Sequence, residues 1–192
     1  MISSSTPLYL ASKSPRRRKL LKQLGLSFKS FSVEMDEEVH PKEKPSKTVL
    51  RLAKEKLKLA KHRIKNGIII TADTIVVIDN QIIGKPKNKK DAFRILKLLS
   101  NKTHFVYTGY SIYNSINRKN ISNYEKTKVT FRKLTDGEII EYIKGGSPMD
   151  KAGAYGIQDD FGAVFISKIN GCYYNVVGLP LAKLYHSLLK IL

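Results

Sequence analysis

The chain has few cysteines, few acidic residues and no long apolar runs, and each of these features narrows the class of protein that it can be. A single cysteine, Cys172, among 192 residues excludes an internal disulfide and indicates a reducing compartment. Apolar runs such as residues 67–70 are far shorter than the roughly 20 residues that span a bilayer. No apolar stretch follows a basic start, so no signal peptide is expected. The sequence therefore predicts a cytoplasmic protein without membrane partners.

Acidic residues are scarce, with 16 against 35 lysines and arginines, which gives a formal net charge of +19. A charge of this size favours nucleic acid, an acidic membrane surface or a small polyanion as partner. The excess is mostly lysine spread along the chain, without the block of roughly five or six like charges that indicates a binding tail. A lysine-rich background explains it too, so the charge supports an anionic substrate without proving one.

Several catalytic motifs are also missing. Neither a G-x-x-x-x-G-K-[ST] phosphate loop nor a G-x-G-x-x-G dinucleotide fingerprint occurs. The four histidines lie too far apart in sequence for zinc spacing: His40, His62, His104 and His186. No Ser-His-Asp or Cys-His pattern is readable.

The composition, with 42% hydrophobic and 27% charged residues, fits one globular domain or one elongated domain with two lobes. Helical and strand patterns alternate, which is typical of an α/β architecture. Helices are expected near residues 15–24, 46–65, 90–99, 135–145 and 180–192. Strands are expected near residues 8–11, 28–33, 68–73, 74–78, 81–83, 103–113 and 121–131, followed by two glycine-rich strands.

The most informative stretch runs from Leu10 to Leu21, where an apolar strand breaks at two serines and a helix follows. Ser14 is a favourable N-cap, and Pro15 suits the first helical position because its missing N–H would be unbonded there anyway. A helix start of this kind attracts anions. We expect Arg16, in the first turn, to contact a ligand. The basic residues after it are expected to form the exposed face of the helix: Arg17, Arg18 and Lys19.

Asp73 ends a nearly unbroken apolar run, where a carboxylate is costly unless it meets a metal, a cation or hydrogen-bond donors. Ligands often bind at strand ends in open α/β sheets. The alternative is a capped turn aspartate. The acidic loop Asp36-Glu37-Glu38 offers the second carboxylate that phosphate-bound Mg²⁺ or Mn²⁺ needs, although a solvated turn explains this loop equally well. Lysines that would suit a polyphosphate, if they are not incidental, are Lys56, Lys85 and Lys151.

Taken together, these segments resemble the Maf family of nucleoside triphosphate pyrophosphatases, in family order and over essentially the whole chain. The motifs that carry the resemblance are Leu10-Ala11-Ser12-x-Ser14-Pro15-Arg16-Arg17, Ala72-Asp73-Thr74-Ile75-Val76, Gly84-Lys85-Pro86, Asp91-Ala92, Leu99-Ser100, His104, Tyr107-Thr108-Gly109, Asp150-Lys151-Ala152-Gly153-Ala154-Tyr155-Gly156-Ile157-Gln158 and Asn175-Val176-Val177-Gly178-Leu179-Pro180-Leu181.

The resemblance implies that residues 1–192 form a single Maf-like α/β domain with the two-lobed fold of inosine triphosphatases. That fold has an elongated mixed β-sheet flanked by helices and an active site in a central cleft. The implied reaction is hydrolysis of a nucleoside triphosphate to the monophosphate and diphosphate with Mg²⁺ or Mn²⁺, as nucleotide-pool house-cleaning. A homodimer is plausible by family precedent.

The resemblance also assigns roles to residues. Asp73 matches the proton acceptor and, with Glu37, the metal site. The implied phosphate-site residues are Ser12, Arg16, Arg17, Lys56 and Lys85. Arg16, Thr74 and Gln158 match the branch that acts on dTTP and UTP. A sister branch that prefers methylated GTP has cysteine at the position of Lys151. Asn101 departs from the usual family glycine and should not affect chemistry.

An alternative function remains: a nucleic-acid-binding or cell-division regulator, since the family has been linked to inhibition of septum formation. No recognition helix or aromatic stacking ladder is evident in the sequence, which favours the enzyme with a small-molecule substrate and no nucleic-acid partner.

Overall fold

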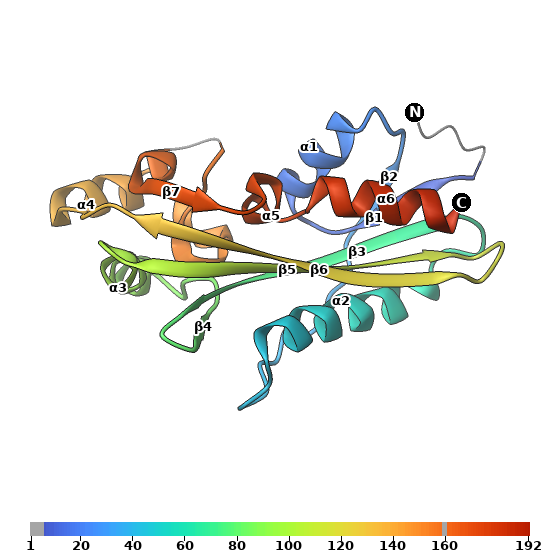
Figure 1. Cartoon of the computed structure of the whole chain (residues 1–192), viewed down its shortest axis with the longest axis horizontal. Helices are drawn as coiled ribbons and strands as arrows, with labels where there is room; N and C mark the ends of the chain where they lie inside the picture. Colours follow the sequence, from blue (N-terminus) through green and yellow to red (C-terminus); the bar gives the residue numbers. More distant parts are fainter. Residues whose placement is uncertain (1–5, 159–160) are drawn as a thin grey trace. The chain divides into compact units, whose positions relative to one another are not determined.

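A computed structural model describes residues 6–158 and 161–192 and has a mixed α/β fold (Figure 1). The strands are β1 (Leu8–Ala11), β2 (Lys29–Phe31), β3 (Ile68–Ile78), β4 (Gln81–Ile83), β5 (Thr103–Asn114), β6 (Asn120–Phe131) and β7 (Ile166–Asn170). The helices are α1 (Pro15–Gln23), α2 (Pro45–Lys61), α3 (Lys89–Leu99), α4 (Asp136–Lys144), α5 (Tyr173–Val177) and α6 (Leu181–Ile191).

The strands form one seven-stranded sheet in the order β2-β1-β3-β5-β6-β7, with β4 paired to β3. Strand β1 runs parallel to both β2 and β3, whereas the β3–β4 and β6–β7 pairs are antiparallel. The sheet is open, because β2 and β7 end the order without pairing to each other. The predicted α/β class with a mixed sheet flanked by helices is confirmed.

Local signals set several element boundaries as expected. Ser14 caps α1 by accepting a hydrogen bond from the Arg17 amide. Thr135 and Glu138 form a reciprocal capping box at the start of α4. The β3–β4 hairpin turns at residues 79 and 80, which have φ angles of 49° and 61°. Aspartate and asparagine tolerate this left-handed conformation better than most residues, which favours the turn at this point.

The region around Asp73 differs from the prediction. We expected one strand to end at Asp73 and another to begin at Thr74, but β3 is continuous from Ile68 to Ile78. Thr71 and Thr74, which flank the Ala72-Asp73 pair, are β-branched and fit a pleated strand, so the single carboxylate does not break it. Asp73 therefore projects from the middle of a buried strand.

The region after α4 also differs from the prediction of two glycine-rich strands. The described residues there form three short 3-10 helices, at Ser147–Asp150, Ala152–Ala154 and Phe161–Phe165, and then the single strand β7. Gly146 and Gly153 both have φ of 74°, a left-handed conformation that interrupts an extended chain.

The chain divides into two compact units, and the division falls within β3 after Asp73. The first unit comprises the chain up to Asp73, Thr108–Glu125 and Gly178–Leu192, and the second comprises Thr74–Tyr107 and Lys126–Val177. That they form one Maf-like domain around a cleft stays a prediction.

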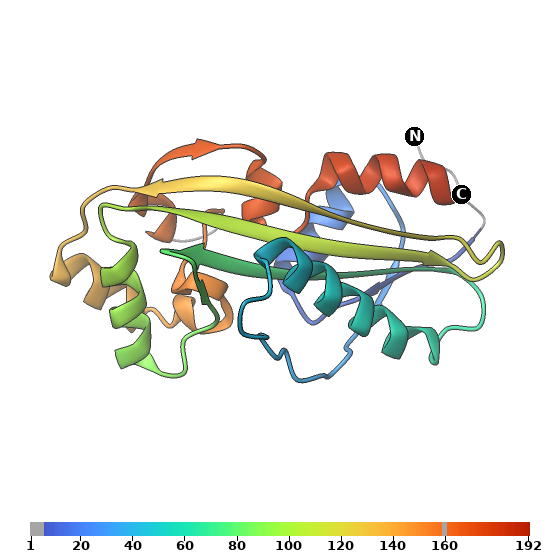
Figure 2. The same ribbon diagram turned by 60° about the horizontal axis from the view of Figure 1, so that its bottom comes forward.

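In the first unit, α2 lies on one face of the sheet, and α1 and α6 lie on the other (Figures 1 and 2). The apolar residues of α2 recur at helical spacing, so they share the face that meets the sheet. Leu57 and Ala60 of this face pack with Ala11 of β1 and Ile69 of β3. This packing fixes the position of Lys56, which also belongs to the buried side of α2.

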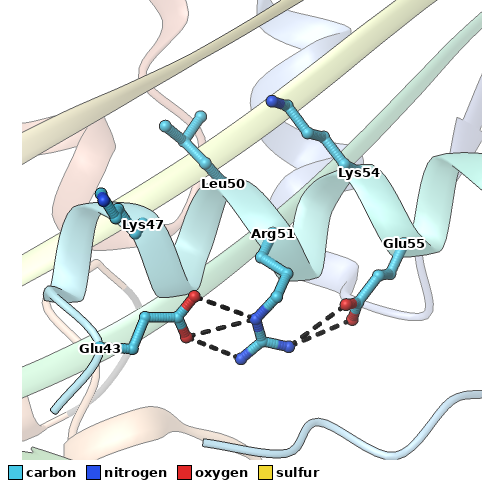
Figure 3. A pocket seen from close by; sticks show the side chains of 6 residues that line it. All are labelled: Glu43, Lys47, Leu50, Arg51, Lys54 and Glu55. Atoms are coloured by element: carbon cyan, nitrogen blue, oxygen red, sulfur yellow. Dashed lines mark hydrogen bonds and ion pairs between the residues drawn. The ribbon is translucent and has the colours of Figure 1, made fainter. Parts of the chain in front are cut away.

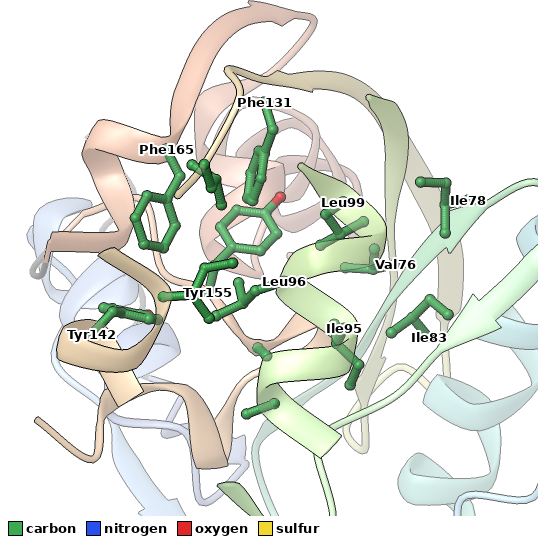
Figure 4. Close-up of a cluster of buried hydrophobic side chains, with 14 of the residues drawn as sticks. Val76, Ile78, Ile83, Ile95, Leu96, Leu99, Phe131, Tyr142, Tyr155 and Phe165 are labelled. Atoms are coloured by element: carbon green, nitrogen blue, oxygen red, sulfur yellow. The ribbon is translucent and has the colours of Figure 1, made fainter. Parts of the chain in front are cut away.

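The second unit has its own aromatic core (Figure 4). The Tyr155 ring packs edge-on against Phe131 with centroids 4.8 Å apart, and the His104 ring contacts both of them. Leu96 and Leu99 of α3 border the same cluster. Within the described residues, no helix combines the length and the apolar character that crossing a membrane requires.

Candidate functional site

Three charged side chains from separate segments of the first unit meet at Lys56. Its Nζ atom lies 2.5 Å from Asp73 Oδ1 and 2.7 Å from Glu37 Oε1. Lys56 comes from α2, Asp73 from β3, and Glu37 from the loop between β2 and α2. One ammonium therefore bridges two carboxylates that are 36 positions apart in the printed sequence, as the residue numbers 37 and 73 give.

Burial differs among these groups. The side chains of Asp73 and Lys56 are 6% and 10% exposed, whereas that of Glu37 is 43% exposed. Burial raises the pKa of the Asp73 carboxyl above its ordinary value, while the positive charge of Lys56 acts in the opposite direction. The negative charge of Glu37 raises it further. A carboxylate with a raised pKa binds a proton more readily, which suits a general base.

The Arg17 side chain is not part of an exposed helix face, contrary to the prediction from the residue pattern. Its Nε donates to the Gly178 carbonyl at 2.9 Å, and NH1 donates to the Ala72 carbonyl at 2.9 Å. Burial lowers the pKa of the guanidinium below its ordinary value, and the charge of Asp73 opposes this shift. Arg17 therefore ties the start of α1 to the residue before Asp73 and to the segment before α6. Arg18 and Lys19 are exposed, as predicted.

The turn between β1 and α1 brings Ser12 to the same group. The Ser12 hydroxyl oxygen accepts hydrogen bonds from the Ser14 amide at 3.2 Å and from Arg17 NH1 at 3.4 Å. Arg16 occupies the first turn of α1 and is half-buried. The first unit thus gathers six of the residues predicted from the resemblance: Ser12, Arg16, Arg17, Glu37, Lys56 and Asp73.

The other predicted residues belong to the second unit. Thr74 follows Asp73 directly in β3 and is half-buried. The segments that carry Lys85 and Lys151 are joined by a hydrogen bond from the Gly153 amide to the Gly84 carbonyl at 3.0 Å. Lys85 is exposed, whereas the Lys151 side chain is 11% exposed and pairs with Asp150 at 3.1 Å.

Gln158 also lies in the second unit. Its Oε1 atom is buried and accepts no hydrogen bond from any residue that the structure describes. A buried amide oxygen without a donor is costly, so this atom is suited to receive a hydrogen bond from a ligand.

The carboxylates of the first unit fit a divalent metal of the Mg²⁺ type. Asp73 and Glu37 both direct an oxygen at the Lys56 ammonium, so a metal that the two carboxylates hold would lie beside this ammonium, and carboxylate oxygens are preferred ligands of Mg²⁺ and Mn²⁺. The described part of the chain has no group of three or more His, Cys, Asp or Glu residues placed to hold a metal. Two carboxylates suffice where substrate phosphates complete the coordination, as is usual for Mg²⁺.

One charged group beside this site was not predicted from the sequence. Arg51 of α2 lies between the carboxylates of Glu43 and Glu55, which border a pocket on the helix (Figure 3). The i, i+4 spacing of Arg51 and Glu55 was a usable signal for their ion pair. No sequence spacing relates Arg51 to Glu43, which precedes the helix.

The fold and the site define a class: a mixed α/β protein that combines a buried carboxylate, Asp73, and an exposed one, Glu37, with basic groups, a set suited to metal-bound phosphates. A family model described as Maf-like protein matches residues 7–191, and the chain belongs to the Maf family. The predicted family and its fold are confirmed.

Curated relatives cover nearly the whole chain. A dTTP/UTP pyrophosphatase of Carboxydothermus hydrogenoformans is 46% identical over 181 residues, which are 94% of this chain and 96% of the relative. One of Caldanaerobacter subterraneus subsp. tengcongensis is 49% identical over 179 residues, 93% and 86% of the two chains. One of Aquifex aeolicus is 46% identical over 182 residues, 95% and 94% of the two chains.

Proposed function

We propose that this protein is a nucleoside triphosphate pyrophosphatase that hydrolyses dTTP and UTP to the monophosphate and diphosphate. The main support for this proposal is that near full-length relatives at 46–49% identity bear the name dTTP/UTP pyrophosphatase. The buried Asp73 beside Lys56 and Glu37 supports the same chemistry. This activity suits house-cleaning of the nucleotide pool, including modified pyrimidine nucleotides.

In the proposed reaction, the Asp73 carboxylate accepts a proton from a water molecule that attacks the α-phosphorus. A new P–O bond forms, the bond from the α-phosphorus to the bridging oxygen breaks, and diphosphate leaves. Asp73 and Glu37 would hold Mg²⁺ or Mn²⁺ together with the phosphates, and the metal, when bound, neutralises phosphate charge. Basic side chains bind the phosphates in this proposal: Arg16, Arg17, Lys56, Lys85 and Lys151, with the hydroxyl of Ser12.

Specificity for the pyrimidine is assigned to Gln158 and Thr74, with Arg16 as the third residue shared with the dTTP/UTP branch. The unpartnered Oε1 of Gln158 supports this assignment, because a base edge with an N–H donor would satisfy it. Thymine and uracil carry a ring N3–H that can donate to this oxygen, whereas the corresponding ring nitrogens of cytosine and adenine only accept hydrogen bonds, so the proposal predicts a preference for dTTP and UTP over the cytosine and adenine nucleotides.

The test is a panel of nucleoside triphosphates assayed for diphosphate and monophosphate release with Mg²⁺ or Mn²⁺. We expect dTTP and UTP to give the highest kcat/KM. Asp73→Asn should lower kcat by roughly 10²–10⁴-fold, the usual contribution of a positioned base, while nucleotide binding persists. Asp79→Asn is the matched control, because Asp79 lies in an exposed turn that asparagine also accepts. Near wild-type turnover in Asp73→Asn would contradict the assignment.

The nucleic-acid-binding or cell-division alternative is not favoured, since the relatives named above are enzymes by name. The cytoplasmic location and the homodimer belong to this proposal as predictions. Size measurement of the purified protein in solution tests the dimer.

A further inference from the structure

The Arg51 guanidinium is held by carboxylates on either side (Figure 3). Its Nε donates to both carboxylate oxygens of Glu43 at 3.1 and 3.2 Å, and NH2 donates to Glu43 Oε2 at 2.8 Å. NH1 donates to the Glu55 carboxylate at 3.3 Å. The side chains of Arg51 and Glu43 are 23% and 17% exposed, so solvent screens their pair less than an ordinary surface ion pair.

One further bond connects Arg51 to the main chain of the acidic loop. Arg51 NH2 donates to the Glu38 carbonyl at 2.8 Å. Glu38 follows Glu37, whose carboxylate contacts Lys56 on the next turn of the same helix. Helix α2 therefore holds two consecutive loop residues, Glu37 by its side chain and Glu38 by its carbonyl. The planar guanidinium can bond to Glu43 and to Glu38 at once, which a lysine ammonium at this position does less well.

Other contacts hold the two ends of this loop, and at its start Arg63 NH1 donates to the Ser32 carbonyl at 2.9 Å. Residues 32–44 form neither helix nor strand. The Lys13–Glu34 pair at the start of the loop has side chains 66% and 80% exposed, and pairs of this kind hold a chain weakly. The Glu43 amide bonds to the His40 carbonyl at 3.2 Å and shapes the last turn before α2. Arg51 thus supplies an anchor one residue from Glu37: its bond to the Glu38 carbonyl is exposed, whereas the pair with Glu43 that holds the guanidinium is partly buried.

We propose that Arg51 is a positioning residue that fixes the acidic loop. The fixed loop keeps the Glu37 carboxylate near the Lys56 ammonium and the Asp73 carboxylate, so that Glu37 and Asp73 can bind the same divalent metal. This inference rests on the proposed function. Arg51 acts through the Glu38 carbonyl and through Glu43. Loss of Arg51 lets the loop sample more positions, which lowers the fraction of molecules whose two carboxylates are ready for the metal.

The test uses the full chain with Arg51→Met, which keeps an apolar stem and removes the donors. Mn²⁺ binding to the nucleotide-free protein is measured by electron paramagnetic resonance, and hydrogen exchange is measured for the amides of residues 34–43. We expect Mn²⁺ affinity to fall about tenfold or more, as for other residues that orient metal ligands. We expect faster exchange in residues 34–43 and unchanged exchange in β3. At saturating Mn²⁺, the KM for dTTP should stay within about threefold of wild type.

Two further variants sharpen the result. Arg94→Met is the matched control, because Arg94 pairs with Asp91 on an exposed helix face of the second unit, and it should change neither readout. Arg51→Lys keeps the charge and should give an intermediate loss of Mn²⁺ affinity, and it serves as the test if Arg51→Met does not fold.

The outcomes separate the two proposals. Wild-type Mn²⁺ affinity and exchange in Arg51→Met, in a protein that hydrolyses dTTP, overturn the Arg51 proposal alone. If both readouts change as expected but the wild-type protein releases no diphosphate from dTTP or UTP, the positioning role is supported and the proposed function fails.

Discussion

Lys56 Nζ lies 2.5 Å from Asp73 Oδ1, and both side chains are buried in the first unit. The same ammonium contacts Glu37 at 2.7 Å, so it pairs with both carboxylates, and the Arg17 guanidinium adds a second positive charge that favours the ionised Asp73. This relation explains how a carboxylate is tolerated in the middle of an apolar strand: its charge is compensated at hydrogen-bond distance.

We predict that Lys56→Gln moves the acidic limb of the pH–kcat/KM profile to higher pH. Lys56 lowers the pKa of Asp73 against the raising effect of burial, so its removal raises that pKa further. Asp73 acts as a base only when it is ionised, and a higher pKa therefore requires a higher pH. The profile is measured at saturating metal. Lys97→Gln, which breaks an exposed pair with Asp136, is the control, and coincident acidic limbs in Lys56→Gln and wild type would count against the relation.

Arg17 gives a prediction for stability. Arg17→Gln removes the donors to the carbonyls of Gly178 and Ala72, and we expect unfolding to become easier by about 1–3 kcal/mol, the cost of buried groups left unsatisfied. Arg18→Gln, one position along the same helix and exposed, should change the free energy of unfolding by less than about 0.5 kcal/mol. Urea denaturation measures both. Equal midpoints for the two variants would show that Arg17 does not join these segments.

His104 predicts a pH dependence of stability. Its ring is buried, Nε2 lies 2.8 Å from the Tyr155 hydroxyl, and burial lowers the pKa of His104 to about 4. The unfolded chain binds this proton near pH 6.5, so between pH 6.5 and 4 the unfolded state holds more protons than the folded state. The free energy of unfolding therefore falls as pH falls through this window, by up to about 3 kcal/mol.

The free energy of unfolding is measured by urea denaturation at several pH values from about 7 to about 4, for wild type and for His104→Gln. The variant should lose much of the slope in this window. His186→Gln, at an exposed position, should keep it. Glu138 also loses stabilisation as pH falls below its ordinary pKa of 4.5, because hydrogen bonds from Arg132 and Thr135 lower its folded pKa to about 2. Both proteins keep this residue, so its contribution cancels when their slopes are compared. An unchanged slope in His104→Gln would refute the prediction.

Gly109 gives a prediction about packing. A Cβ atom at this position would meet the main-chain carbonyl of Val49 on α2 at closer than van der Waals distance. Gly109→Ala should therefore destabilise the protein by about 1–3 kcal/mol or more, because strand β5 and helix α2 must separate. Gly137→Ala is the matched control, because a Cβ atom at this position meets no atom within 4 Å. Gly137 lies in α4, where alanine should raise the free energy of unfolding by about 0.5–1 kcal/mol. Thermal unfolding distinguishes the two, and a Gly109→Ala protein as stable as wild type would show that no close approach exists.

Much of the fold could be predicted because its signals are local. The cap at Ser14, the capping box at Thr135 and the turn at Asp79 each depend on contacts within about four residues. The apolar periodicity of α2 likewise identified its buried side, and Asp73 was identified as a costly carboxylate from its apolar neighbours alone.

The partners of the charged residues, by contrast, follow from the packing of distant segments. Arg17 is exposed by residue pattern, yet it bonds to a carbonyl 161 residues away in sequence. Arg51 and Glu38, which are hydrogen-bonded, lie 13 residues apart in the sequence, and no periodic pattern predicts their contact. Sequence determined the elements and the charged groups available, because propensity and patterning act over a few residues. The pairing of those groups depends on how distant segments pack, and only the folded chain sets those distances.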